Sequence, residues 1–134
     1  MQEETYILIV DDDPDILEGI TLILESQSYK LATARDGIKC MQMMREDKPD
    51  LLILDLLMPR MDGWGVIREV RSEPRFADIP ILVLSTVVED ASRRRYELET
   101  GLKMEVQDYI QKTARRDDLL RRVEKLLAGK ESRG

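Results

Sequence analysis

The sequence predicts an α/β fold, a doubly wound parallel sheet of five strands built from five successive β-α units. Two observations support this prediction. Apolar runs at residues 6–10, 51–54 and 79–84 are continuous rather than alternating, which is typical of strands buried on both faces of a sheet. Segments with helical spacing of apolar residues lie between these runs, and the connections are only a few residues long.

The size and composition agree with one folded domain. The chain has 134 residues, 43% of them hydrophobic and 36% charged, which is enough apolar material for a core. A net charge of −6 argues against direct binding of nucleic acid, because neutralising phosphates requires a basic face. The absence of histidine excludes His-based triads and His metal ligands, and the single cysteine excludes an internal disulfide. No apolar stretch is long enough for a membrane span and the start is not a signal peptide, so we expect a cytoplasmic protein with no membrane partner.

Each strand is expected to be followed by a helix. Residues 30–34 and 107–111 are two further, more polar strand candidates. Apolar residues recur with helical spacing in segments 16–24, 38–44, 66–70 and 119–127, and the polar segment 90–100 is compatible with a fourth helix in chain order. A flavodoxin-like strand order of 2-1-3-4-5 is the natural arrangement for this pattern. We predict the domain over residues 5–128 and a polar tail, expected to fray, over residues 129–134.

Polar residues stand where the predicted strands end. In a doubly wound sheet the ligand lies beyond the carboxyl ends of the strands, at the switch point between the first and third strands. The residues at these ends are Asp11, Asp12, Asp13, Asp55, Ser85, Thr86 and Lys112. Converging carboxylates repel one another unless a cation neutralises them, and an oxygen-only cluster favours Mg²⁺ or Mn²⁺ over other metals, with Ca²⁺ a further alternative.

Two of these acidic residues also have simpler interpretations. Asp13 alone is equally well explained as the start of a helix, where a negative charge interacts favourably with the helix dipole. A lone aspartate after an apolar strand is more often a turn residue, but the acid pair after the first strand and Lys112 favour a functional role for Asp55. A carboxylate held beside a metal ion and an ammonium group stays ionised and is a competent nucleophile for phosphoryl transfer.

The motifs that contain these residues resemble the receiver domain of two-component response regulators. They read YILIVDDDP, LLILDLLMPRMDG, ILVLST and DYIQK, and the resemblance covers about residues 5 to 127. It implies a single-domain or isolated receiver, that is, a phosphorylation-activated signalling switch in a two-component system or phosphorelay.

The resemblance also implies a role for each matching residue. Asp55 would be the phosphoacceptor, and Asp11, Asp12, Asp55 and the backbone carbonyl of Leu57 would hold Mg²⁺. Ser85 and Lys112 would contact the phosphoryl group, and Tyr109 would be the aromatic switch residue that moves with Ser85. The implied partners are a sensor histidine kinase or histidine phosphotransfer protein, an unknown downstream target, and a phosphorylation-dependent homodimer. Output would pass through the face formed by the fourth helix, fifth strand and fifth helix.

The sequence departs from the family pattern in three places. Thr113 follows Lys112 where members usually have proline, often after a cis bond. A cis bond before a non-proline residue costs about 3–4 kcal/mol, so we expect a trans bond here or a strained loop. The segment 101–108 contains more residues than the turn that usually precedes this tyrosine position in the family. Leu57 and Val87 cannot orient an attacking water by hydrogen bonding, so we predict slow self-dephosphorylation.

Two alternative functions compete with this interpretation. A pseudo-receiver would keep the fold as an interaction module without phosphorylation, and the replacement of proline by Thr113 leaves room for it. A phosphohydrolase of the haloacid-dehalogenase type would use Asp11 as its nucleophile, but no cap domain fits within 134 residues. We therefore expect a protein that is not a metabolic enzyme and at most catalyses its own phosphorylation and dephosphorylation.

Overall fold

The computed structural model describes residues 4–58, 60–85, 94–95, 97–98 and 106–132. Its elements, in chain order, are β1 (Tyr6–Val10), α1 (Pro14–Glu25), β2 (Lys30–Ala34), α2 (Gly37–Glu46), β3 (Leu51–Asp55), α3 (Gly63–Ser72), β4 (Ile81–Ser85), β5 (Asp108–Gln111) and α5 (Arg116–Ser132). The strands form one parallel sheet in the order β2-β1-β3-β4-β5, which confirms the predicted fold and strand order.

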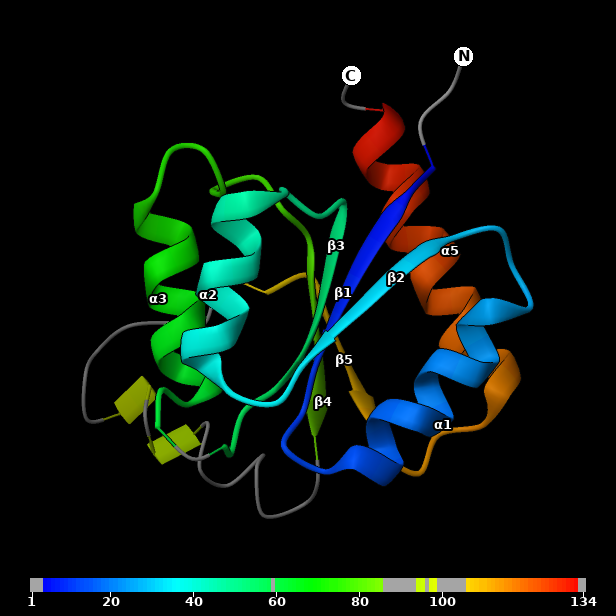
Figure 1. Cartoon of the computed structure of the whole chain (residues 1–134), viewed down its shortest axis with the longest axis horizontal. Helices are drawn as coiled ribbons and strands as arrows, with labels where there is room; N and C mark the ends of the chain where they lie inside the picture. The colour runs from blue at the N-terminus through cyan, green and yellow to red at the C-terminus, as the bar shows by residue number, and fades with distance from the viewer. Residues whose placement is uncertain (1–3, 59, 86–93, 96, 99–105, 133–134) are drawn as a thin grey trace.

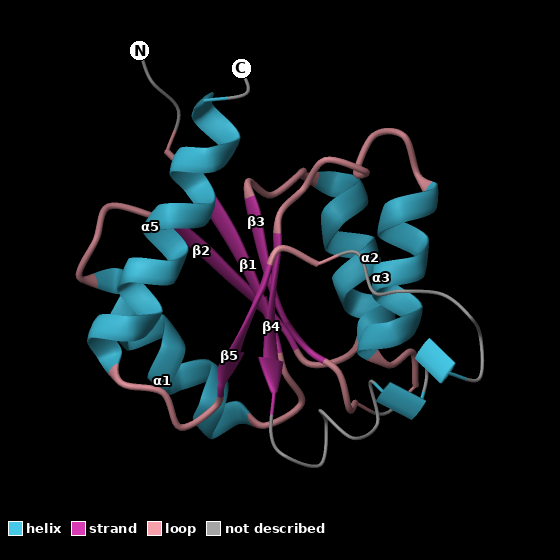
Figure 2. Cartoon of the chain, turned by 180° about the vertical axis from the view of Figure 1, so that it is seen from behind, coloured by secondary structure: helices cyan, strands magenta, loops and turns pink. Residues whose placement is uncertain are grey.

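Helices cover both faces of the sheet. Helices α1 and α5 lie on one face and α2 and α3 on the other (Figures 1 and 2). Two buried clusters fill the spaces between the layers, and side chains of β1 and β3 alternate between the two. All residues of β1 and β3 are buried, which explains why residues 6–10 and 51–54 are continuously apolar.

Aspartates define the starts of three helices. Asp13, Asp36 and Asp62 are the N-caps of α1, α2 and α3, and each carboxylate accepts a hydrogen bond from a backbone N–H of the first turn, at 2.8–2.9 Å. Pro14 occupies the first turn of α1, where its missing N–H costs nothing. The simpler interpretation of Asp13 as a helix start is therefore confirmed.

Some boundaries differ from the predicted ones. The strand expected at 79–84 begins at Ile81, after Pro80, which has no N–H to donate, and it ends at Ser85. Helix α5 continues to Ser132 and so extends into the segment 129–134 that we predicted as a polar tail. Of the helix predicted over residues 90–100, only residues 94, 95, 97 and 98 are described, and these are helical. None of the described helices has the length and apolar character required to cross a membrane.

Candidate functional site

Two buried aspartates lie side by side at the carboxyl edge of the sheet. Strands β1 and β3 are parallel neighbours with Val10 opposite Leu54, so the next residues, Asp11 and Asp55, emerge together. Neither residue has exposed surface. Among the described residues, they are the only polar or charged side chains that are buried. A pair of carboxylates at this depth is costly unless cations or hydrogen-bond donors compensate their charge.

Lys112 supplies one compensating charge. It follows β5 directly, and its Nζ lies 3.3 Å from Oδ2 of Asp11 and 3.2 Å from Oδ1 of Asp55. Backbone N–H groups add weaker support, because Asp13 donates to Asp11 at 3.0 Å and Leu57 donates to Asp55 at 3.4 Å. One ammonium group therefore faces two buried carboxylates.

The raised pKa of Asp11 indicates that this compensation is incomplete. Burial raises the pKa of Asp11 from 3.8 to about 6, the hydrogen bond from Asp13 opposes the rise, and the charge of Asp55 adds to it. Lys112 lowers the pKa of Asp11, but by less than burial raises it. The site therefore favours additional positive charge next to Asp11.

A third carboxylate completes the acidic cluster. Asp11, Asp12 and Asp55 each bring one carboxylate oxygen to within 4.8 Å of the others. Hard oxygen ligands at this spacing, with two of them deeply buried, suit a divalent cation such as Mg²⁺. The residues present therefore fit the predicted metal, and Asp11, Asp12 and Asp55 are the side chains that would hold it.

The loop between β3 and α3 packs tightly against its surroundings. A side chain at Gly63 would collide with the backbone of Asp55 and would come within 2.6 Å of Cα of Leu56. Gly63 N–H also donates to the carbonyl of Leu56 at 2.9 Å, and Arg60 adopts a positive φ of 65°. This close packing fixes the backbone that leads from Asp55 through Leu57, whose side chain is 43% exposed.

Helix α2 supports the same loop from the other side. Gly37 donates its N–H to the carbonyl of Met61 at 3.0 Å, and a Cβ at Gly37 would lie 2.8 Å from that of Met61. Asp36 pairs with Arg60 at 3.3 Å. This support could not be predicted from the sequence, because no local pattern indicates that residues 36–37 and 60–61 come into contact.

The other predicted residues belong to β4, β5 and the segments that follow these strands. Ser85 ends β4, next to the β5 strand, and its side chain lies outside the described residues. Tyr109 is half-buried and packs against the core cluster between the sheet and α2 and α3. The Lys112–Thr113 peptide bond is trans, as predicted. Val87 and residues 101–105 of the longer segment also lie outside the described residues.

Comparison with known proteins identifies the family. The sequence matches the response regulator receiver domain over residues 7–124. The chain belongs to this family. Receiver domains act in two-component signalling and are not metabolic enzymes, so the haloacid-dehalogenase interpretation of Asp11 is not supported.

Individual relatives agree with this assignment. Response regulator MprA of Mycobacterium ulcerans is 39% identical over 121 residues, which cover 90% of this chain and 49% of MprA. The chain thus spans about half the length of the curated relatives it matches. A signal receiver domain of a histidine kinase from Syntrophus aciditrophicus is 31% identical with a TM-score of 0.80, covering 93% of this chain and 91% of that one.

One structural relative contains the predicted metal. The receiver domain of a sensor histidine kinase from Pseudomonas aeruginosa is 25% identical, with a TM-score of 0.81 and coverage of 94% of this chain and 99% of that one. It was solved with a magnesium ion coordinated in its active-site cleft.

Proposed function

We propose that this receiver is a phosphorylation-activated switch that accepts a phosphoryl group on Asp55 in the presence of Mg²⁺. The observation that carries the proposal is the placement of Asp55, which is fully buried, ion-paired with Lys112 and grouped with Asp11 and Asp12. The donor is a phosphohistidine on a sensor kinase or a histidine phosphotransfer protein, the class of donor that serves receiver domains.

The transfer converts the Asp55 carboxylate into an acyl phosphate. A carboxylate oxygen of Asp55 attacks phosphorus, the new P–O bond forms as the P–N bond to histidine breaks, and that electron pair stays on the imidazole nitrogen. Asp11, Asp12, Asp55 and the carbonyl of Leu57 would hold Mg²⁺, which would neutralise charge on the carboxylates and on the incoming phosphoryl oxygens. Lys112 is already within 3.2 Å of Asp55 and pairs with the added negative charge.

The effect of phosphorylation is then transmitted from Asp55 to strands β4 and β5. Ser85 donates its hydroxyl to a phosphoryl oxygen, and Tyr109 follows the movement of Ser85. The face that includes β5 and α5 presents the change to a downstream protein or to a second copy of the domain. These steps follow the family resemblance, and the half-buried position of Tyr109 on the strand that leads to Lys112 supports them.

Chemical phosphorylation tests the proposal directly. Incubation with acetyl phosphate and Mg²⁺ should add one phosphoryl group, detected by intact mass, and beryllofluoride should bind the same site. Asp55→Asn should abolish both, and EDTA should block labelling of the wild type. The matched control is Asp47→Asn, which removes an exposed carboxylate at the end of α2, away from the site, and should be labelled normally.

The same experiment distinguishes the pseudo-receiver alternative. A folded wild-type protein that gains no phosphoryl group from acetyl phosphate, and binds no beryllofluoride with Mg²⁺ present, would be an interaction module without phosphorylation. Equal labelling of Asp55→Asn and wild type would show that another residue is the phosphoacceptor.

A further inference from the structure

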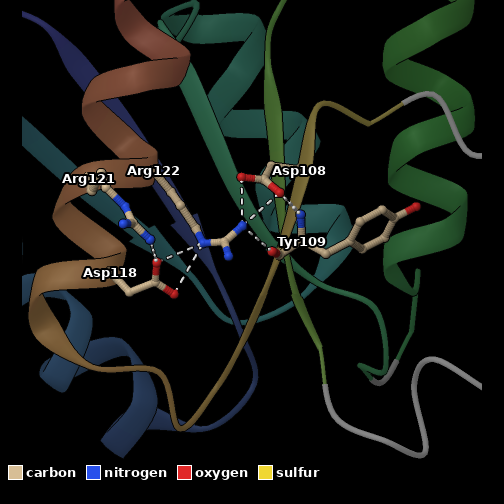
Figure 3. A network of polar contacts seen from close by, with 5 residues as sticks. All are labelled: Asp108, Tyr109, Asp118, Arg121 and Arg122. Carbon is tan, nitrogen blue, oxygen red and sulfur yellow. Dashed lines mark hydrogen bonds and ion pairs between the residues drawn. The ribbon is translucent and has the colours of Figure 1, made fainter.

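A network of charged side chains joins α5 to the edge of the sheet, outside the acidic site. Nη1 of Arg122 lies 2.9 Å from each carboxylate oxygen of Asp108, and Nε lies 3.1 and 3.2 Å from the two oxygens of Asp118 (Figure 3). Arg122 is 32% exposed, and the hydrogen bond to Asp108 raises the pKa of its guanidinium further above the ordinary value. The guanidinium of Arg122 is therefore charged and partly shielded from solvent.

The network also holds the backbone of Tyr109. The N–H of Tyr109 donates to Oδ1 of Asp108 at 2.8 Å, and the carbonyl of Tyr109 accepts from Nη1 of Arg122 at 3.1 Å. These two groups belong to the peptide planes on either side of the Tyr109 Cα. Fixing both planes fixes the direction of the Cα–Cβ bond, about which the side chain rotates.

Within the part of the chain that the structure describes, the strand that carries Tyr109 lies at the edge of the sheet. Strand β5 is the last in the strand order and pairs with β4. The Tyr109 ring points away from Arg122, toward the side of the sheet covered by α3, so the ring and the guanidinium lie on opposite sides of β5 (Figure 3). Three residues later the same chain reaches Lys112, in contact with Asp11 and Asp55.

We propose that Arg122 is a positioning residue for Tyr109, tying both of its peptide planes to α5 so that the ring turns about a fixed axis when Asp55 is modified. This inference rests on the proposed function, in which Tyr109 is the switch residue. Arg122 does not act on Asp55, because its contacts lie at the beginning of β5 and the acidic site lies beyond its end. Loss of Arg122 should therefore separate acceptance of the phosphoryl group from the response of Tyr109.

Fluorine NMR of protein labelled with fluorotyrosine measures that response. The chain has four tyrosines, and Tyr109→Phe identifies the resonance of Tyr109. In the wild type, beryllofluoride with Mg²⁺ should move this resonance to a new single position. In Arg122→Gln the resonance should shift by less than half as much or split into several signals, while labelling of Asp55 by acetyl phosphate stays within twofold of wild type.

Arg121 provides the matched control. It is the preceding residue on α5, carries the same charge and bonds Asp118 at 2.6 Å, but its side chain is 75% exposed and, within the described residues, its bonds do not reach Asp108 or Tyr109. Arg121→Gln should respond to beryllofluoride as the wild type does. Arg122→Lys keeps the charge but replaces the planar fork by a single ammonium, so it should give an intermediate shift, which also tests the inference if Arg122→Gln fails to fold.

The outcomes separate the two proposals. A full wild-type shift in Arg122→Gln, or equal losses in Arg121→Gln and Arg122→Gln, would overturn the positioning role. A wild type that is labelled at Asp55 but shows no shift at Tyr109 would overturn it as well. Absence of both labelling and beryllofluoride binding in every variant would instead contradict the proposed function.

Discussion

At the scale of single residues, the acidic site places negative charge where folding alone does not favour it. Asp11 and Asp55 are both fully buried, and Lys112 is shared between them at 3.2–3.3 Å. A raised pKa for Asp11 is the direct consequence of this arrangement. Burial of these charges lowers the stability of the metal-free protein and favours the binding of a cation at the site.

The burial of Asp11 predicts how the stability of the metal-free protein depends on pH. The pKa of Asp11 is about 6 in the folded chain against 3.8 for the free group, so folding disfavours the ionised form. Its contribution to the free energy of unfolding should fall as pH rises between these two values, by up to about 3 kcal/mol. Asp11→Asn removes this contribution and can still accept the hydrogen bond from Asp13.

Urea unfolding in EDTA measures the effect as a difference between Asp11→Asn and wild type. The variant should be more stable than wild type at about pH 7.5, and the advantage should be much smaller at about pH 4, which lies near the lower end of this window, where Asp11 is protonated in the folded chain. Carboxylates that do not interact with Asp11 titrate alike in both proteins, so their contributions cancel in the difference. An advantage that is equal at the two pH values would contradict the burial argument.

Leu57 predicts a long-lived phosphorylated state. Its side chain is 43% exposed next to the site and offers no hydrogen bond to an attacking water. Leu57→Asn should shorten the lifetime of phospho-Asp55 several-fold, measured by the loss of the added phosphoryl mass after removal of acetyl phosphate. Ile38, which is also 43% exposed, provides the control Ile38→Asn, whose lifetime should match wild type. A wild-type lifetime of seconds that Leu57→Asn leaves unchanged would refute the prediction.

At the scale of elements, the start of α2 is part of the support of the site. Gly37 contacts the loop between β3 and α3 so closely that a Cβ there would meet Met61 within 2.8 Å. Gly37→Ala should therefore destabilise the fold by about 1–3 kcal/mol, because either α2 or the loop must shift. The shift should also weaken Mg²⁺ binding, since this loop carries Leu57.

Gly19 offers the opposite substitution as a control. It lies within α1, and a Cβ at this position would meet nothing within 4 Å. Gly19→Ala should stabilise the protein by about 0.5–1 kcal/mol through its effect on helix propensity. Thermal and urea unfolding of both variants would check the two signs, and destabilisation of similar size in both would refute the role of Gly37.

Most elements could be predicted from the sequence, because the buried strands are continuously apolar and the helices repeat their apolar residues with helical period. The predicted strand ends also indicated that Asp11, Asp55 and Lys112 lie at one edge of the sheet, where the structure brings them into contact. Contacts between elements could not be predicted in this way. The bond between Arg122 and Asp108 joins residues 14 apart and depends on how α5 is rotated against β5, which no local pattern specifies.

At the scale of the whole molecule, cation binding and folding should be coupled. The three carboxylates come together only in the folded chain, so Mg²⁺ should raise the free energy of unfolding by about 2.7 kcal/mol at a hundredfold excess over its Kd. Thermal unfolding with and without Mg²⁺ at about pH 7.5 measures the shift. Asp12→Asn should lose most of it, whereas Asp47→Asn should keep it, and an equal shift in both variants would place the cation elsewhere.

The described ends of the chain lie on the opposite side of the molecule from the acidic site. Strand β1 begins and α5 finishes at the same edge of the sheet (Figure 1), whereas Asp11 follows the end of β1 and Asp55 ends β3 at the other edge. An affinity handle, a fluorophore or a surface tether attached at either terminus would therefore leave the phosphodonor's approach open. Immobilised protein should accept acetyl phosphate as readily as protein free in solution.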